Sequence, residues 1–391
     1  MRRVRAAAFL AIACAGLMLL AVKAQGAVPA EGVSDARFAR LARLARGINL
    51  SHWFAQSPRG DYSAEHLTTY NTERDLDLIA RMGFSHVRLT LNPKAVSDAP
   101  EGLPFHAERL ALLDAAIAGF LARHVAVVVD LHPDDDFKTP LAKDDAAVER
   151  LVAFWRALAA HLADTDPERV FFEVMNEPVI PDADRWNAVQ KQVLAAMRAS
   201  APRHTLIATG PRWSSVDELQ KVEQVADPNV VYNFHLYDPH NFTHQGATWG
   251  ADFWRHFKNV PYPADPEAVE KILPGIADER AKQILRGYGK ERWNADKVEA
   301  LVVRAADWAK AHGVRLTCNE FGVYRKVSPP EARLRWIRDV RTALEKHHIG
   351  WAMWDYAGGF SVVVEKDGRR VPDPATLDAL GLEITPGVIN R

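Results

Sequence analysis

Apolar segments of strand length recur along the chain, and segments with helical periodicity separate them. Within each strand candidate Val, Leu, Ile and Phe stand close together, which is typical of strands covered on both faces. The eight strand candidates are residues 47–51, 84–91, 125–132, 170–177, 205–210, 230–237, 315–322 and 350–357. This alternation predicts a parallel sheet built from strand–helix units.

The segments between these strands carry apolar residues at helical spacing. Residues 146–163 illustrate the period, because their apolar side chains recur every three or four positions: Val148, Leu151, Val152, Trp155, Leu158 and Leu162. Such a stripe predicts a helix that packs one face against a sheet. Amphipathic helices are predicted over residues 71–82, 108–122, 146–163, 183–199 and 330–347.

Eight strand–helix units without a glycine-rich dinucleotide motif or a P-loop favour a closed (β/α)8 TIM barrel over a doubly wound open sheet. The connection at residues 238–265, after the sixth strand, is too long for an ordinary barrel loop. It contains five aromatic residues: Phe242, Trp249, Phe253, Trp254 and Phe257. We expect an extended loop with short helical pieces there.

The N-terminal segment has the pattern of an export signal. Three arginines among the first five residues precede an apolar run over residues 6–22, and the small residues Val22 and Ala24 offer a cleavage site. We predict that residues 1–24 are a cleaved signal peptide, that residues 25–391 form one domain, and that the protein is periplasmic or extracellular. An uncleaved membrane anchor is the alternative, because the run is long for a signal core and short for a membrane span.

Charge and cysteine content narrow the partners. Lys and Arg number 49 against 50 Asp and Glu, so the chain lacks the basic excess that binds phosphate backbones or anionic lipid. We therefore expect a monomer with neutral substrates, no nucleic-acid partner and no stable membrane partner after signal cleavage. Of the two cysteines, Cys14 lies in the predicted signal, and a lipid there is disfavoured because apolar sequence continues beyond it. Cys318 then stands alone and is interpreted as a buried core residue, so no internal disulfide is expected.

Polar residues collect where the predicted strands end. In a TIM barrel the active site lies at the carboxyl ends of the strands, and charged residues in apolar strands are costly unless they are paired or used. Six predicted strands carry candidate site residues: Arg88 on the second, His132 on the third, Asn176 and Glu177 on the fourth, His235 and Tyr237 on the sixth, Glu320 on the seventh and Trp354 on the eighth.

Two of these residues are carboxylates on the fourth and seventh strands, which face each other across an eight-stranded ring. Glu177 and Glu320 suit the hydrolysis of an acetal, which needs a proton donor and, in the retaining mechanism, a nucleophile about 5 to 5.5 Å away. Arg88 and Tyr237 beside Glu320 would favour its ionised form, whereas a less compensated Glu177 could hold a proton.

Five short strings carry a resemblance to a known family: Val87-Arg88-Leu89, Asp130-Leu131-His132, Asn176-Glu177-Pro178, His235-Leu236-Tyr237 and Glu320-Phe321-Gly322. Over about residues 45 to 358 the chain resembles glycoside hydrolase family 5, the cellulase family of clan A. The resemblance implies a retaining enzyme in which Glu177 is the acid/base and Glu320 the nucleophile. It further implies that substrate is bound by Arg88, His132, Asn176, His235, Tyr237 and Trp354, and that no cofactor or metal takes part.

The resemblance also implies a polysaccharide or oligosaccharide substrate cleaved internally. Residues 235–239 and 242–246 look most like the bacterial cellulases, which favours β-1,4-glucan; β-mannan and β-1,3-glucan are the alternatives. Residues 47–53 depart from the pattern, because many family cellulases have a second Gly there, and this bears on the outer subsites.

Several residues have a functional and a structural interpretation. Trp53, Trp213 and Trp249 are candidates for outer sugar subsites or for packing. In the long loop, His240 and His244 could reach the substrate, or the loop could pack on itself.

Two rival functions differ from a glycoside hydrolase in the residues that they require. A metal-dependent barrel hydrolase would use Asp130, His132, His235 and Asp238, but it needs closely grouped ligands, and the first strand offers Asn49 and His52 rather than a His-x-His pair. A silent carbohydrate-binding barrel would lack one catalytic carboxylate, and both are present.

Overall fold

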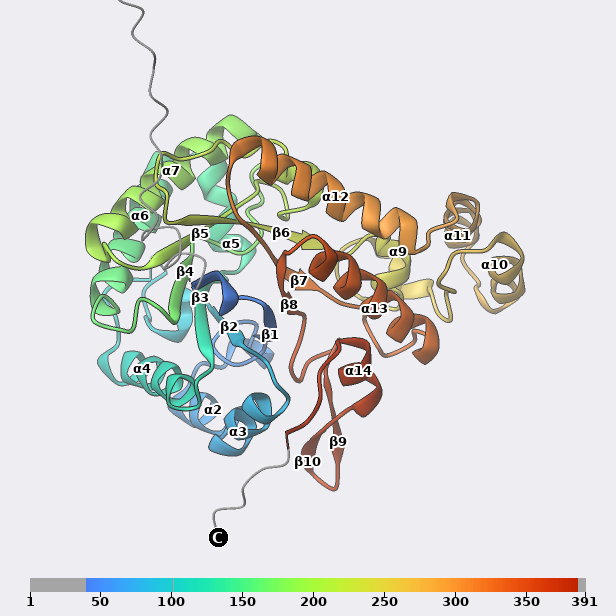
Figure 1. Ribbon diagram of the computed structural model, residues 1–391, viewed down its shortest axis with the longest axis horizontal. Coiled ribbons are helices and arrows are strands. Elements are labelled where there is room, and N and C mark those ends of the chain that lie inside the picture. The colour runs from blue at the N-terminus through green and yellow to red at the C-terminus, as the bar shows by residue number, and fades with distance from the viewer. Residues whose placement is uncertain (1–39, 101, 386–391) are drawn as a thin grey trace, which may run out of the picture.

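The computed structural model describes residues 40–100 and 102–385, so the predicted signal peptide lies outside the described residues. Eight parallel strands follow one another around a closed barrel, in which β8 pairs with β1 (Figure 1). The strands are β1 (Arg46–Leu50), β2 (His86–Leu91), β3 (Ala126–Leu131), β4 (Val170–Glu173), β5 (Thr205–Thr209), β6 (Val230–Leu236), β7 (Leu316–Phe321) and β8 (Gly350–Met353). The predicted TIM barrel is confirmed.

Helices surround the barrel, and the five predicted ones are present within two residues of their expected bounds. They are α3 (Glu73–Arg81), α4 (Ala107–Ala122), α6 (Asp145–His161), α7 (Ala183–Ser200) and α13 (Pro330–Lys346). The sequence pattern left α12 (Ala295–His312) unassigned, together with the short helices α2 (Ala64–Thr69), α5 (Asp135–Lys138), α8 (Val216–Leu219) and α14 (Pro374–Ala379). Within the described part of the chain, no helix combines the length and the apolar character needed to cross a bilayer.

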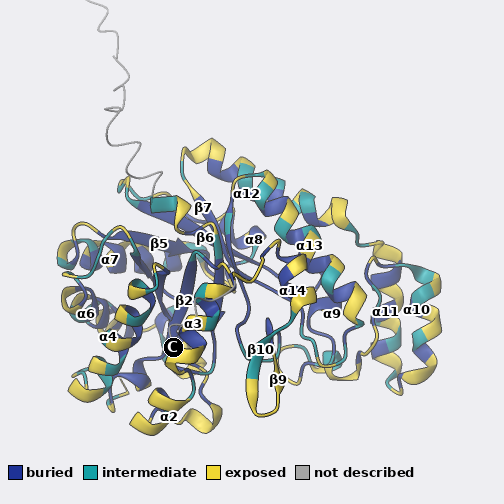
Figure 2. Ribbon diagram, turned by 60° about the horizontal axis from the view of Figure 1, so that its bottom comes forward, coloured by how far each residue is buried: buried dark blue, intermediate teal, exposed yellow. Residues whose placement is uncertain are grey.

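Alternation along the strands separates two apolar layers. In β3, Val127 and Val129 join the large core between the strands and the helices, whereas Ala126 and Val128 belong to a small cluster inside the barrel. Leu44, Phe171, Ile207 and Val231 complete that inner cluster. Figure 2 shows the result, with buried strands at the centre and exposed residues on the outer faces of the helices.

Towards the carboxyl ends the inward positions change from apolar to polar. The buried residues Asp130, Glu173 and Asn233 each lie two positions after an apolar residue of the inner cluster, whereas Arg88 and Asn319 lie two positions after His86 and Thr317. Because all strands run in parallel, these polar groups gather at the same end of the barrel. The fold thereby places one polar cluster at the mouth of the barrel.

The predicted strands four, six and eight are too long by one to four residues. β4 ends at Glu173, β6 at Leu236 and β8 at Met353, so Asn176, Glu177, Tyr237 and Trp354 lie in the following loops, whereas His235 stays in β6. The residues that follow these strands are also buried, so the sequence keeps the appearance of a strand. Hydrogen bonding between neighbouring strands nevertheless stops at these positions.

Two segments extend away from the barrel. The segment after β6 is longer than predicted, because α9 (His240–Thr243) is followed by α10 (Pro266–Ile272) and α11 (Glu279–Glu291), which project at one end of the molecule in Figure 1. After β8, strands β9 (Val363–Lys366) and β10 (Arg369–Pro372) form an antiparallel hairpin that the sequence pattern did not predict. Asp367 and Gly368 turn this hairpin with φ values of 52° and 67°, as a tight two-residue turn requires.

Candidate active site

A single buried guanidinium organises the polar end of the barrel. Arg88 donates from Nε and Nη2 to the two oxygens of Glu173 at 2.9 and 2.8 Å, and from Nη1 to Glu320 Oε1 at 2.6 Å. Its Nη2 also lies 3.0 Å from Asp130 Oδ2. Burial alone would lower the pKa of Arg88, but the three carboxylates together raise it. The side chain therefore stays charged and offsets carboxylates that would otherwise be buried without a partner.

Arg88 also fixes the amide of Asn176, the residue before Glu177. Arg88 Nη2 donates to Asn176 Oδ1 at 3.0 Å, so the amide nitrogen of Asn176 faces His132 Nε2 at 3.1 Å. Since Nε2 accepts there, the ring proton of His132 lies on Nδ1, 2.9 Å from Asp130 Oδ2. Burial lowers the pKa of His132 well below its usual value, which keeps the ring neutral. The second N–H of Asn176 takes no part in these bonds and is available to a ligand.

Glu320 receives two strong donors. Arg88 binds one carboxylate oxygen, and the Tyr237 hydroxyl donates to the other, Oε2, at 2.9 Å. Burial raises the pKa of Tyr237 well above its usual range, and the charge of Glu320 adds to this, so the phenol keeps its proton for donation. Hydrogen bonds of this kind stabilise the ionised form of a carboxyl group.

Glu177 has a different environment. Its Oε1 lies 2.9 Å from His235 Nδ1, and its side chain is 26% exposed against 6% for Glu320. Asn233 donates to Nε2 of His235 at 3.4 Å, so the proton that His235 shares with Glu177 is on Nδ1. Burial lowers the pKa of His235 to about 4, so Glu177 faces a neutral donor rather than a cation.

The backbone of Glu177 is strained. Its φ is +40°, in the left-handed region that residues other than Gly rarely adopt. Lys138, a buried lysine of α5, donates from Nζ to the carbonyl oxygen of Glu177 at 3.3 Å. Strain held in place by neighbouring groups is a frequent property of functional positions.

The two glutamates are close enough to influence each other. The nearest ligand atoms of Glu177, His235 and Glu320 all lie within 4.8 Å of one another. Burial raises the pKa of both carboxyl groups, and the charge of Glu177 raises that of Glu320 further, against the opposing effect of His235 and Arg88. Arg88 and Tyr237 both donate hydrogen bonds to Glu320 and favour its ionised form. A proton shared by Glu177 and Glu320 therefore resides on Glu177.

Trp354 forms an apolar wall beside this cluster. Its ring stacks on His132 with centroids 5.6 Å apart, and it packs in a small aromatic cluster with Tyr237 and Phe360. The next residue, Asp355, accepts a hydrogen bond from Ser51. Ser51 lies in the stretch 47–53 after β1, so this hydrogen bond ties that stretch to the loop that carries Trp354.

The structure therefore brings together all eight residues that the sequence analysis selected. Sequence reasoning missed the layer beneath them, in which Asn233 and Asn319 donate to Glu173 Oε1 and Oε2 at 3.1 and 2.6 Å. The signal was available, because Glu173 interrupts the apolar strand Val170–Glu173 at an inward position. Lys138 was missed because nothing in its local sequence indicates that α5 turns it towards Glu177.

The additional candidates have divided outcomes. Trp53 is buried and donates from Nε1 to Leu67 O at 2.8 Å, so its interpretation as an outer subsite is wrong. Trp213 and Trp249 are 56% and 48% exposed and remain candidates. His244 is buried and stacks on Trp254 with centroids 4.9 Å apart, so the long loop packs on itself at this point.

The residues of the rival metal site are engaged elsewhere. Asp130 and His132 bind each other and Arg88 or Asn176, and among the described residues the convergent group is Glu177, His235 and Glu320 instead. Each oxygen of Glu320 already accepts a hydrogen bond, and His235 donates to Glu177. This group is arranged for hydrogen bonding and proton transfer.

Comparison with known proteins agrees with this geometry. The family model for cellulase (glycosyl hydrolase family 5) matches residues 50–359. Endoglucanase C of Acetivibrio thermocellus is 30% identical over 316 residues, which cover 79% of this chain and 90% of that protein. Cellodextrinase A of Ruminococcus flavefaciens is 28% identical over 78% of this chain and 83% of its own length.

Solved structures show the same barrel. Endoglucanase Cel5A from Thermotoga maritima superimposes with a TM-score of 0.69 at 25% identity, covering 88% of this chain and 99% of that one. The matching family model spans well over half of the chain, including every residue from Arg88 to Trp354 discussed above. The chain is a glycoside hydrolase and belongs to glycosyl hydrolase family 5, the cellulase family.

Proposed function

We propose that the protein is a retaining endo-β-1,4-glucanase. The observation that carries this proposal is the spacing of Glu177 and Glu320, whose nearest oxygens lie within 4.8 Å. Retaining glycosidases place their carboxyl groups about 5 to 5.5 Å apart, whereas inverting enzymes leave about 6.5 to 9.5 Å for a water molecule. The spacing supports direct attack by one carboxylate.

In the first step Glu320 attacks the anomeric carbon and forms a glycosyl ester, while Glu177 gives its proton to the departing glycosidic oxygen. In the second step Glu177 takes a proton from water, the resulting hydroxide attacks the same carbon, and Glu320 is released as a carboxylate. The hydrogen bonds that Glu320 accepts from Arg88 and Tyr237 suit the nucleophile, and the neutral donor His235 lets Glu177 alternate between acid and base.

Two neighbours act on the reacting sugar in this scheme. The free N–H of Asn176 binds the 2-hydroxyl, an interaction that strengthens as the oxocarbenium-like transition state forms. Trp354 offers an apolar face on which the pyranose ring can stack.

The substrate assignment draws on the relatives. Proteins named endoglucanase and cellodextrinase match over most of this chain, which favours β-1,4-glucan. β-Mannan is the second candidate, because the structures of Thermotoga maritima Cel5A, at 25% identity, include complexes with both cellobiose and mannotriose. Export to the periplasm or the medium, inferred from residues 1–24, fits a polymeric substrate.

Reducing-sugar release on soluble β-1,4-glucan, β-mannan and β-1,3-glucan tests the substrate, with Glu320→Ala as the blank. We expect activity on β-1,4-glucan with a rapid fall in viscosity, as internal cleavage requires. Proton NMR of an early digest tests the mechanism. The β-anomer should appear first, and early α-anomer would refute the nucleophilic role of Glu320.

A further inference from the structure

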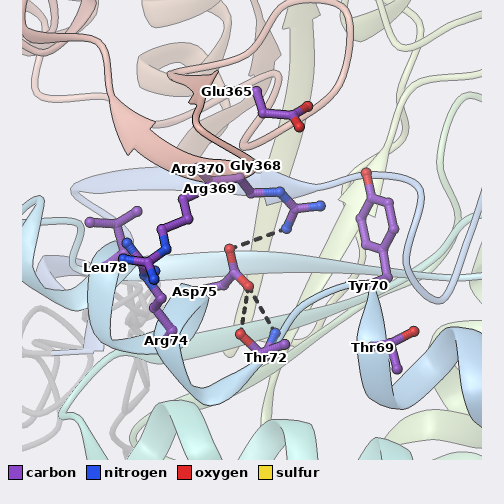
Figure 3. A pocket seen from close by; sticks show the side chains of 10 residues that line it. All are labelled: Thr69, Tyr70, Thr72, Arg74, Asp75, Leu78, Glu365, Gly368, Arg369 and Arg370. Carbon is purple, nitrogen blue, oxygen red and sulfur yellow. Dashed lines mark hydrogen bonds and ion pairs between the residues drawn. The ribbon is translucent and has the colours of Figure 1, made fainter.

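Two adjoining hollows lie between the α2–α3 segment and the β9–β10 hairpin, outside the cluster described above. The first, of about 360 Å³, is lined by Tyr70 and Asp75 on one side and by the hairpin residues Glu365 and Arg370 on the other (Figure 3). The second, of about 460 Å³, shares Tyr70, Glu365 and Arg370 with the first and also reaches Ala357. Each volume is in the range of about 300 to 1,000 Å³ that is usual for ligand sites.

The second hollow borders the loop that carries Trp354. Ala357 and Ser361, which line it, belong to the same loop as Trp354. Asp355, next to Trp354 in the chain, is near enough to Tyr70 for its charge to raise the pKa of that phenol, although burial is the larger cause. The second hollow thus lies against the loop that carries the apolar wall of the active site.

Neighbouring side chains hold Arg370 in place between the two walls of the hollows. The Arg370 guanidinium lies 4.7 Å from the ring centroid of Tyr70 and 5.5 Å from that of Tyr356, and its Nη1 is 3.2 Å from Asp75 Oδ1. The Tyr356 hydroxyl donates to the same Asp75 oxygen at 2.7 Å. Figure 3 shows the guanidinium held between Asp75 and Tyr70. A cation fixed in this way presents its remaining N–H groups in a set direction.

Several polar groups here have no protein partner within the described ranges. The Tyr70 hydroxyl and the Glu365 carboxylate make no hydrogen bond or ion pair there, and neither does Nη2 of Arg370. Asn71 is buried and accepts a hydrogen bond from Arg370, which helps to hold the guanidinium, but it lines neither hollow.

The chemistry of these groups favours an uncharged polyol. Tyr70 and Arg370 donate and Glu365 accepts, a mixture that matches hydroxyl groups, which do both. Charges of both signs line the hollows, since Arg74, Arg325 and Arg369 lie there as well as Arg370, Asp75 and Glu365. Arg370 is paired with Asp75 and Arg325 with Asp373, which leaves a mixed polar lining that suits a neutral ligand.

We propose that the two hollows form a distal subsite for a neutral β-glucan chain, with the Tyr70 hydroxyl, the Arg370 guanidinium and the Glu365 carboxylate binding sugar hydroxyls. The proposal rests on the function proposed above. Glu177, which protonates the leaving group, follows β4, whereas Trp354 follows β8 on another side of the barrel. A chain that continues past Trp354 therefore belongs to the retained, non-reducing portion of the substrate.

Nitrophenyl β-glycosides of cellobiose to cellopentaose test the subsite, because they lengthen only the retained portion while the leaving group stays constant. The readout is the ratio of kcat/KM between the longest and the shortest glycoside, measured by nitrophenol release. The variants are Tyr70→Phe, which keeps the ring under Arg370, and Glu365→Ala, alone and combined. The control is Glu149→Ala, an exposed position on α6.

We expect the wild type and Glu149→Ala to share a ratio well above one, and the double variant to lose about tenfold of it, as two hydrogen bonds suggest. An unchanged ratio in the double variant would overturn the subsite, as would a wild type that gains nothing from added sugars. A uniform loss on all glycosides leaves the ratio unchanged and also counts against it. Activity on none of the glycosides or glucans would contradict the proposed function, and the subsite with it.

Discussion

Replacing Arg88 by Met removes the one cation that three buried carboxylates share. The side chain is fully buried, and its nitrogen atoms contact Glu173, Glu320 and Asp130 at 2.6 to 3.0 Å. Removing one partner of a buried ion pair costs about 3 to 5 kcal/mol. Protonation of the freed carboxyl groups limits the further cost, so we expect a loss in this range, which many domains of about 5 to 15 kcal/mol total stability survive.

The loss of stability should depend on pH. Burial already raises the pKa of Asp130, to about 6, and that of Glu173, so their values in the folded state exceed those in the unfolded chain. Without Arg88 these values rise further. The stability that such groups contribute is complete below the unfolded-state pKa and is lost as the pH rises through the folded-state pKa. Arg88→Met should therefore be destabilised more at pH 8 than at pH 5.

Urea unfolding at pH 5 and at pH 8 measures this difference in stability. The dependence of kcat/KM on pH measures how the loss of Arg88 changes the pKa of the nucleophile Glu320. Because Arg88 favours the ionised form of Glu320, the acid limb of the activity profile should move to higher pH in the variant. Arg286→Met is the matched control: its partner Glu270 is 56% exposed, and such surface pairs contribute about 0 to 1 kcal/mol. The reasoning is refuted if Arg88→Met costs no more than this control at pH 8 and keeps the wild-type acid limb.

Substitutions at four further positions have distinct expected outcomes. Glu320→Ala and Glu177→Ala should each lower kcat on β-1,4-glucan by about 3 to 4 orders of magnitude with unchanged circular dichroism, and a mild loss at either would contradict its role. Lys138→Met should move the alkaline limb of the activity profile to higher pH, because the lysine charge lowers the pKa of Glu177. Lys138→Arg keeps the charge and should restore the limb. An unmoved limb in Lys138→Met would show that Lys138 does not lower the pKa of Glu177. Trp354→Ala should lower kcat/KM for short glycosides about tenfold or more through the lost stacking surface, and wild-type kcat/KM would show that no sugar stacks there.

The sequence was informative about Glu320 and Arg88 for a physical reason. A charged residue in a buried strand must have a partner, so Arg88 and Glu320 could be paired before any coordinates were considered. The same argument applies to Glu173, whose charge directly follows Phe171 and Phe172 in a buried strand, but it was overlooked there. Periodicity indicated α3, α4, α6, α7 and α13 because each has an amphipathic face, but it did not place the helices between β6 and β7.

The hairpin β9–β10 and the tryptophans show where local reasoning fails. Residues 363–372 are mostly polar and pair only with each other, so no apolar alternation marks them as strands. Trp53, Trp213 and Trp249 each follow a strand, yet only the latter two are exposed, because the surroundings of a side chain depend on segments far away in the chain.

What the sequence by itself determined is the barrel, the two glutamates and the polar residues around them, because strand periodicity and the cost of buried charge are local properties of the chain. The tertiary structure decided the distance between Glu177 and Glu320, the proton positions on His132 and His235, and the approach of Lys138 to Glu177. It also decided that Arg370 lies against Tyr70, 300 residues earlier in the chain. These features depend on how segments far apart in sequence pack, and no local pattern encodes that packing.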